Sequence, residues 1–524
     1  MAQKMGKGLG RGKILLRPLP WQRQEGSVLN TVTPTPLAFF RRNAQQIKQS
    51  GHIFVTKDRD VLSELTRRQT GDYVAKAKTI RAIWNEVPGI FGLTLPIVMS
   101  LSASTLIGVT DSIMLAPLGA VPLAAVGLTT AVAVIFYATI FGLLSALSVR
   151  IGHAHGARTF RHIPTLLRSG LALGAMVGVG AALVMGAIFP LLPLLGQPEA
   201  VIAALPAYWT LIALFLIPFS MLTVFKSAFE AVGRPWLGTI FAFMAVIINI
   251  PLNYALIWGI GPLPMLGLTG AGLAALIAET LALLAAWTWW QVAASQRRLR
   301  LRRKVDMTEI KITAVEGAPL GAMYAIETAA VGIATLMIGS FGTVALAGNQ
   351  VAQSVGSLLY MLPLGVAGAV AIRVAQERGA GNVGALRPIA YAALSLALIW
   401  LTGAAILLVF RGEAVARLIT DDAEVVAVAT LIFLTFAPMQ ISDGVQSSML
   451  GALRGLSDTA WPATVSAIAY WIVALPMGYA FAYWGDLGPA GVWAGFVLSL
   501  ACAGAALVWR FQVKTEQFIG KGRA

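Results

Sequence analysis

The chain has 524 residues, of which 57% are hydrophobic and 12% are charged, and its formal net charge is +16. Soluble domains carry about 25% charged residues, so this composition excludes an ordinary soluble protein and indicates a membrane protein. The one cysteine, Cys502, excludes a disulfide framework and any cysteine-based metal or redox site. The positive charge lies in short segments between apolar runs, which is typical of membrane topology and not of a nucleic-acid-binding surface.

Residues 1–87 form a basic tail with 16 Lys and Arg against 6 Asp and Glu. The tail holds no apolar core followed by a small-residue cleavage site, so it is not a secretory signal. We predict a mostly disordered cytosolic tail that rests on anionic lipid headgroups, with a partner-binding arm as the alternative. Residues 72–87 are expected to form an amphipathic lead-in to the first membrane span.

Apolar runs long enough to cross about 30 Å of hydrocarbon follow the tail. In the first half they lie near 88–110, 122–147, 165–192, 199–222, 236–258 and 268–292. In the second half they lie near 317–340, 347–371, 386–410, 424–450, 461–484 and 488–510. The sequence therefore predicts an all-α protein of twelve spans in two six-helix lobes, over 88–294 and 317–512. A basic linker over 295–316 joins the lobes, and residues 513–524 form a C-terminal tail.

The basic residues predict the orientation of these spans. Of the 39 Lys and Arg, all except Arg411 and Arg417 lie in the terminal tails or in alternate connecting segments. Because cytosolic segments carry the excess of Lys and Arg, we expect both termini in the cytosol. The basic linker is interpreted as a topology anchor.

The two predicted lobes are similar to each other in sequence. Residues 96–157 realign on residues 319–380 at a constant offset of 223 positions. The matched pairs include Pro96 with Pro319, Gly119 with Gly342, Gly142 with Gly365, Arg150 with Arg373, and Gly156 with Gly379. Two like-oriented bundles that meet at a central seam are typical of carriers that alternate access.

Few acidic residues lie inside the predicted spans, and such residues are costly and usually functional. Asp111 ends the first span, Glu279 lies in the sixth, Glu327 in the seventh and Asp443 in the tenth. No Lys or Arg is expected well inside a span, so these carboxylates have no obvious internal counter-ion. A buried carboxylate without a cationic partner takes up a proton or binds a cation. The pattern indicates coupling to H⁺ or Na⁺.

Neighbouring polar side chains could supply further oxygen ligands. Asn249 and Asn253 share one face of the fifth span, and Pro251 between them frees a backbone carbonyl. The same spacing places four polar residues on one face of the tenth span: Gln440, Asp443, Gln446 and Ser447. The alternative for such amides is that they hold helices together, and Glu279 could equally be a hydrogen-bonded residue of the lobe interior.

Three histidines resemble a metal cluster: His153, His155 and His162. They lie in a short basic segment, so a solvated cytosolic loop is the preferred interpretation. No cofactor is expected, and no metal other than a coupling ion.

In these motifs the sequence is similar to the multidrug and toxic compound extrusion (MATE) family, above all to its bacterial NorM-type branch. The resemblance covers about residues 88–510. In the first half it rests on 95–96 with 110–114, on 123–127, on 142–146 and on 249–254. In the second half it rests on Glu327, 342–347, 361–365, 440–443, 451–455, 458–459, 470–471 and 475–479.

The resemblance implies two lobes around a central cavity that export organic cations and drugs against inward flow of Na⁺ or H⁺. In NorM-type members, a Glu of the seventh span and an Asp of the tenth form the second-lobe cation site. These two residues correspond to Glu327 and Asp443. The first-lobe cluster corresponds to Asp111, Asn249 and Asn253.

Glu279 and Gln440 are additional candidates for cation binding, and Glu279 has no family counterpart. Two positions depart from the family pattern: Asn349 replaces a common His, and Met439 a frequent Tyr. The coupling ion therefore stays open between Na⁺ and H⁺.

Other functions remain as alternatives. A flippase for lipid-linked oligosaccharides shares this architecture but would favour an Arg-lined cavity, and no Arg is expected inside the spans. A membrane enzyme would need a metal motif, a Walker loop or a catalytic domain, and none is visible in the sequence. A channel would need a repeated selectivity ring, and the isolated carboxylates of a duplicated bundle do not provide one. We expect a monomer of the bacterial inner membrane that binds drugs and no nucleic acid.

Overall fold

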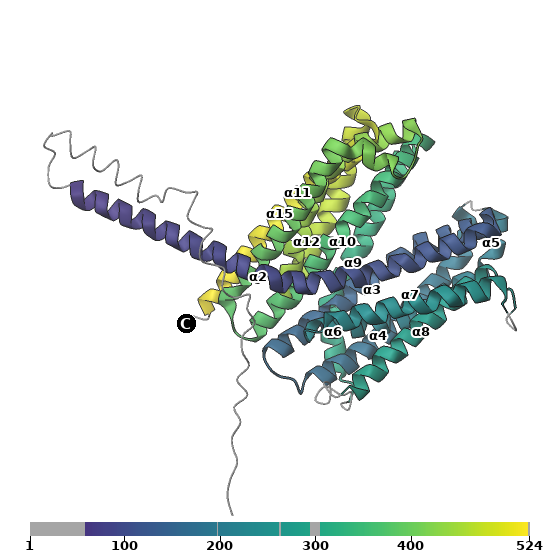
Figure 1. Ribbon diagram of the computed structural model, residues 1–524, viewed down its shortest axis with the longest axis horizontal. Coiled ribbons are helices and arrows are strands. Elements are labelled where there is room, and N and C mark those ends of the chain that lie inside the picture. The colour runs from purple at the N-terminus through teal and green to yellow at the C-terminus, as the bar shows by residue number, and fades with distance from the viewer. Residues whose placement is uncertain (1–57, 196–197, 261–263, 294–303, 522–524) are drawn as a thin grey trace, which may run out of the picture. The chain divides into compact units, whose positions relative to one another are not determined.

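A computed structural model describes residues 58–195, 198–260, 264–293 and 304–521 (Figure 1). Within these ranges, 12 helices are long and apolar enough to cross a membrane. This confirms the prediction of an all-α protein with twelve spans. The chain divides into two compact units, residues 1–76 and 77–524, and the spans lie in the second. The predicted tail over residues 1–57 lies outside the described residues.

Six long helices form the first half: α2 (Asp58–Leu115), α3 (Ala120–Gly156), α4 (Ile163–Ile188), α6 (Pro206–Ala231), α7 (Pro235–Trp258) and α8 (Leu268–Val292). Short helical segments join them: η1 (Ala116–Leu118), η2 (Phe189–Leu195) and α5 (Glu199–Ala204). Within this half, α4 and α8 each pack on α6, and α7 packs on α6 and α8 (Figure 1).

The second half repeats the pattern with α9 (Met307–Gly339), α10 (Thr343–Gly379), η4 (Val383–Ala385), α11 (Leu386–Arg417), α12 (Ala423–Gly455) and α15 (Gly488–Lys521). Its eleventh span alternates between α-helix and wider π-helix: α13 (Ala460–Ala467), η5 (Ile468–Ala474), α14 (Leu475–Tyr479) and η6 (Ala480–Trp484). Single wide π turns inside membrane helices occur frequently at functional sites.

The repeat is visible in the backbone. Gly119 and Gly342, which lie 223 positions apart, directly precede α3 and α10 and both have φ of 107°. Only glycine adopts this conformation readily, so the same residue starts the second helix of each half. We call the end at which α3 and α10 finish the basic end, because the connections there carry most of the basic residues.

The first helix of each half packs partly into the other half at the basic end. Ile90, Leu93 and Ile97 of α2 belong to a core cluster formed otherwise by residues of the second half. Ile310, near the start of α9, belongs to the core of the first half. The two halves are therefore interlocked by an exchange of helix ends.

Glycines allow the halves to touch closely at the basic end. A Cβ atom on Gly156 would lie 1.8 Å from the carbonyl oxygen of Gln376. At the equivalent position of the second half, a Cβ on Gly379 would lie 2.1 Å from the carbonyl oxygen of His153. The two contacts are related by the repeat, since 153 and 156 plus 223 give 376 and 379.

The helices run beyond the predicted span ends. The predicted lead-in over 72–87 belongs to the continuous helix α2. Residues 307–316 of the predicted linker belong to α9, whose start is capped by Asp306 through its carboxylate and the backbone N–H of Thr308 at 2.9 Å. Hydropathy detects the apolar part of each helix, whereas the backbone hydrogen bonds continue through the polar turns outside it.

Candidate functional site

The first-lobe site joins α2 to α7 through three buried side chains. The amide of Asn253 donates hydrogen bonds to the Asp111 carboxylate and, at 3.1 Å, to Asn249 Oδ1. Helix α7 continues through Pro251, so the two asparagines keep the four-residue spacing that places them on one face. Among the described residues, Asn253 Oδ1 has no hydrogen-bond partner. Together with the carboxylate it offers oxygen ligands of the kind that Na⁺ prefers.

A cavity with a volume of about 610 Å³ opens beside this cluster. Asp111 and Glu279 both line it, and the other lining residues are mainly apolar or aromatic. The aromatic ones are Tyr137, Tyr208, Phe215 and Phe219. The structure therefore brings Glu279 into the same cavity as Asp111, which its position in the sequence did not predict.

Two basic residues lie near the ends of their spans, Lys226 in α6 and Arg454 in α12. Lys226 lies in α6 and its charge acts on Glu279, so this carboxylate does have an internal counter-ion. Arg454 is buried in α12 and donates to the carbonyl oxygen of Ala367 at 3.1 Å. Both residues lie where α6 and α12 extend past the apolar runs, so the prediction that no Lys or Arg lies well inside a span is not contradicted. Long basic side chains can bury their stems at such helix ends.

The second-lobe site contains two carboxylates from different helices. Asp443 of α12 is buried, Glu327 of α9 is half-buried, and the two are near enough to repel each other when both are charged. The hydroxyl of Tyr470, on the π-helical segment η5, hydrogen-bonds Glu327. The next residue, Trp471, donates to the carbonyl oxygen of Ile326 at 3.1 Å. These contacts hold η5 against α9.

Sequence analysis missed the role of Tyr470. The signal was present, because an aromatic pair precedes Pro476 in the eleventh span. A proline interrupts helical hydrogen bonding and favours the wider turn that aims Tyr470 at Glu327.

The amide side chains of the second half hydrogen-bond to groups other than Glu327 and Asp443. Gln440 donates to the carbonyl oxygen of Gly356 at 3.1 Å, and Gln446 donates to Ser466 Oγ at 3.0 Å. Asn349, at a position where the family often has His, accepts a hydrogen bond from Trp493 at 2.9 Å. These amides tie helices together, and within the described residues no hydrogen bond joins Gln440 to either acid of the site.

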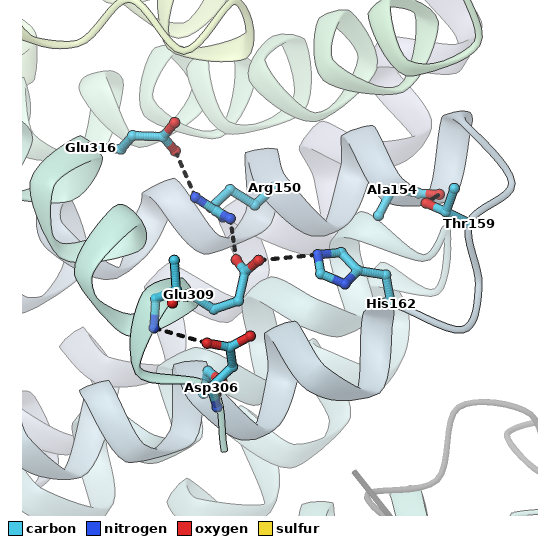
Figure 2. Close-up of polar contacts among 9 residues, drawn as sticks. Arg150, Ala154, Thr159, His162, Asp306, Glu309 and Glu316 are labelled. Carbon is cyan, nitrogen blue, oxygen red and sulfur yellow. Dashed lines mark hydrogen bonds and ion pairs between the residues drawn. The ribbon is translucent and has the colours of Figure 1, made fainter. Parts of the chain in front are cut away.

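Ion pairs lie where the halves touch at the basic end. Figure 2 shows Arg150 of α3 between Glu309 and Glu316 of α9, with 3.8 Å from its guanidinium to Glu316. His162 lies 3.3 Å from Glu309. His153 and His155 lie in the last turn of α3 and not in a loop. In the described part of the chain, no three His, Cys, Asp or Glu side chains are grouped to hold a metal ion.

Comparison with known proteins agrees with this geometry. The profile of the MatE family matches residues 96–255 and 319–480. The chain is 31% identical over 432 residues to the probable multidrug resistance protein NorM of Acinetobacter baylyi, covering 81% of this chain and 95% of that protein. It is 30% identical to the multidrug resistance protein MdtK of Pectobacterium atrosepticum, covering 82% of this chain and 96% of that protein.

Solved structures show the same fold. The MATE transporter VcmN of Vibrio cholerae in its bent form aligns with a TM-score of 0.72 and 22% identity, covering 84% of this chain and 99% of that one. The relatives are transporters and not enzymes. From the matched family profile and the NorM relatives, the chain is a multi-pass membrane protein that belongs to the MATE transporter family, in its NorM-type branch.

Proposed function

We propose that this protein exports organic cations and drugs in exchange for Na⁺ or H⁺ that flows inward. The observation that carries the proposal is the pair Glu327 and Asp443, two carboxylates from different helices of a membrane bundle that are near enough for their charges to interact. Like charges in a site of low dielectric strongly favour a bound cation or a shared proton. The names of the relatives, multidrug resistance proteins, support drugs as the exported substrates.

The proposed mechanism is competition between the coupling cation and the drug. A cation from outside binds the carboxylates, and this neutralises charge and favours the conformation that holds a cationic drug less well. A ligand shifts such an equilibrium only by its differential affinity for the two states. Coupling free energies of about 1–3 kcal/mol are typical of this linkage.

In this proposal the basic end faces the cytosol, both termini are cytosolic, and the protein acts as a monomer in the bacterial inner membrane. The distribution of Lys and Arg supports the orientation. The first-lobe cluster of Asp111, Asn249 and Asn253 provides a second cation site. The site needs no cofactor for this exchange.

The test is efflux of ethidium from proteoliposomes under an imposed gradient of Na⁺ or of H⁺. We expect one of the two gradients to drive efflux by the wild-type protein, and Glu327→Gln to abolish it. The matched control is Glu413→Gln, which removes an exposed acid paired with Arg417 in the same half. Efflux that continues unchanged in Glu327→Gln would remove the second-lobe pair from the mechanism.

Folded wild-type protein that exports no ethidium under either gradient would contradict drug antiport. The lipid-linked oligosaccharide flippase would then be the function to test. In that case the buried Arg454 would be the first candidate for a pyrophosphate ligand, although its guanidinium already donates to Ala367.

A further inference from the structure

The first-lobe cavity contains two acids in different surroundings. Asp111 accepts a hydrogen bond from Asn253 in the amide cluster. Glu279 lines the same cavity on α8, and its neighbouring charge is Lys226 on α6. The ammonium group of Lys226 lies 5.8 Å from the ring centre of Phe219, and this ring also lines the cavity. Lys226 is not a lining residue of this cavity, but it lies beside the lining residue Phe219 and within electrostatic range of Glu279.

We infer that Glu279 is the anchor for the positive group of an organic cation bound in the first-lobe cavity. Burying a carboxylate is costly, and a nearby ammonium group offsets part of that cost. Lys226 therefore supports an anion at Glu279 without filling the cavity. This inference rests on the proposed function, because it names the residue that holds the exported substrate.

The size and lining of the cavity fit such a ligand. A volume of about 610 Å³ lies within the range of about 300–1,000 Å³ that is usual for drug-sized ligands. Aromatic rings such as Tyr137 and Phe215 offer apolar surface and π-faces, which attract a cation. Asp111 is already hydrogen-bonded to Asn253, whereas Glu279 faces the cavity. The two acids can therefore bind different ligands, with the coupling ion at Asp111 and the substrate at Glu279.

The test is equilibrium binding to the purified full-length protein without any gradient. Ethidium serves as the cationic probe and N-phenyl-1-naphthylamine as the uncharged probe. We expect Glu279→Gln to weaken ethidium binding at least tenfold and to change binding of the uncharged probe less than twofold. Asp111→Asn, a matched change in the same cavity, should retain ethidium binding while gradient-driven efflux falls about tenfold.

The role of Lys226 has its own expected results. Lys226→Met should weaken ethidium binding several-fold, and Lys226→Arg, which keeps the charge, should restore it. Ethidium binding that is unchanged in Glu279→Gln, or equal losses for both probes, would overturn the inference. Tighter ethidium binding by Lys226→Met would show that Lys226 competes with the ligand, which contradicts the supporting role. Since binding needs no gradient, these results are independent of whether the protein is an antiporter.

A different observation, at the basic end, carries a second inference. Arg150 pairs with Glu309, and Arg373 pairs with Glu86 at 2.9 Å. The two pairs are related by the repeat, since 86 and 150 plus 223 give 309 and 373. In each pair the arginine belongs to the second helix of one half and the glutamate to the first helix of the other. The same interlock is thus built twice.

We propose that these two ion pairs form a clasp that closes the basic end and opens when the transporter changes conformation. They lie beside the close backbone contacts of Gly156 and Gly379. The Nε atoms of Arg150 and Arg373 are both buried without a hydrogen-bond partner among the described residues. Each guanidinium is therefore incompletely satisfied in the closed arrangement, which lowers the cost of opening.

A cysteine placed in the contact reports opening. Ala375 of α10 is buried against Gly152 of α3, with 3.5 Å between Ala375 Cβ and the position of a Cβ on Gly152. In the full-length protein with Cys502→Ser and Ala375→Cys, we would measure the rate of labelling by a maleimide. Arg150→Gln should raise this rate several-fold, and Arg150→Gln with Arg373→Gln should raise it further.

Two controls distinguish the clasp from general loosening. Arg150→Lys, which keeps a positive charge between Glu309 and Glu316, should retain slow labelling. Arg387→Gln breaks an ion pair of 3.0 Å with Glu516 inside the second half and should leave the labelling rate unchanged. Labelling that stays slow in the Arg150→Gln and Arg373→Gln double variant would overturn the clasp, as would fast labelling of Arg387→Gln.

Discussion

In the first lobe, Asp111 accepts a hydrogen bond from an amide, whereas in the second lobe Glu327 faces another carboxylate, Asp443. The repeat relates the two lobes as backbones, yet it does not relate these two sites chemically. Both Asp111 and Glu327 accept a hydrogen bond, from Asn253 and from Tyr470, but only Glu327 has a second carboxylate nearby that disfavours its charged form. The second-lobe site should therefore depend more strongly on its bound cation or proton than the first-lobe site does.

The largest expected effect is that of Asp443→Asn. It replaces the acid near Glu327 by a neutral amide, so gradient-driven efflux should fall by about 100-fold, equivalent to about 3 kcal/mol of lost coupling. The same substitution should raise the thermal unfolding temperature, because it removes repulsion between two buried acids. Ethidium efflux and thermal unfolding of the same preparation measure both results. A destabilised variant with unchanged efflux would contradict this description of the pair.

Asp111→Asn should have a smaller effect, about a tenfold loss of efflux. The amide that replaces the carboxylate can still accept the hydrogen bond from Asn253, so the unfolding temperature should stay nearly the same. Titration of the driving ion should show that higher concentrations partly restore efflux. If Asp111→Asn matched Asp443→Asn in size and could not be restored, the contrast between the two sites would be wrong.

Asn253→Leu tests the amide cluster itself. It leaves the Asp111 carboxylate buried without its donor, and an unsatisfied buried polar group costs about 1–3 kcal/mol. The variant should therefore unfold at lower temperature than wild type. The loss should shrink in the double variant with Asp111→Asn, because the orphaned charge is then absent. Independent, additive losses would show that the two side chains do not interact.

The smallest effect is expected for Gln440→Leu. The side chain of Gln440 donates to the carbonyl oxygen of Gly356, so its removal should cost about 1 kcal/mol of stability. Efflux should stay within about twofold of wild type. A large loss of efflux in a variant of wild-type stability would instead assign Gln440 to the second-lobe cation site.

The membrane itself explains why much of the fold was predictable. In the bilayer, a helix satisfies its backbone N–H and C=O groups internally, and its apolar side chains must cover about 30 Å of hydrocarbon. Long apolar runs in the sequence therefore indicate the spans directly. The span count followed from this constraint. The span ends did not, because α9 starts at Met307 and α12 continues to Arg454 and Gly455 through turns that hydropathy does not detect.

The candidate acids were also predictable, since a carboxylate inside a span is rare and costly. The spacing of Asn249 and Asn253 placed both on one face of α7, and the structure joins them to Asp111. Gln440 shared a face with Asp443 by the same argument, but its amide is bound to α10. Spacing along one helix shows which residues share a face and leaves open which helix that face meets.

The sequence by itself determined the number of spans, the duplication at an offset of 223 and the small set of acids inside the membrane. Only the tertiary structure decided which residues from different helices face one another: Lys226 and Glu279, Tyr470 and Glu327, and Arg150 and Glu309. The physical reason is that the hydrocarbon thickness of the bilayer constrains each helix separately, so its effect is visible in the composition of that helix alone. Contacts between helices depend on rotation and packing, which arise only when the bundle assembles.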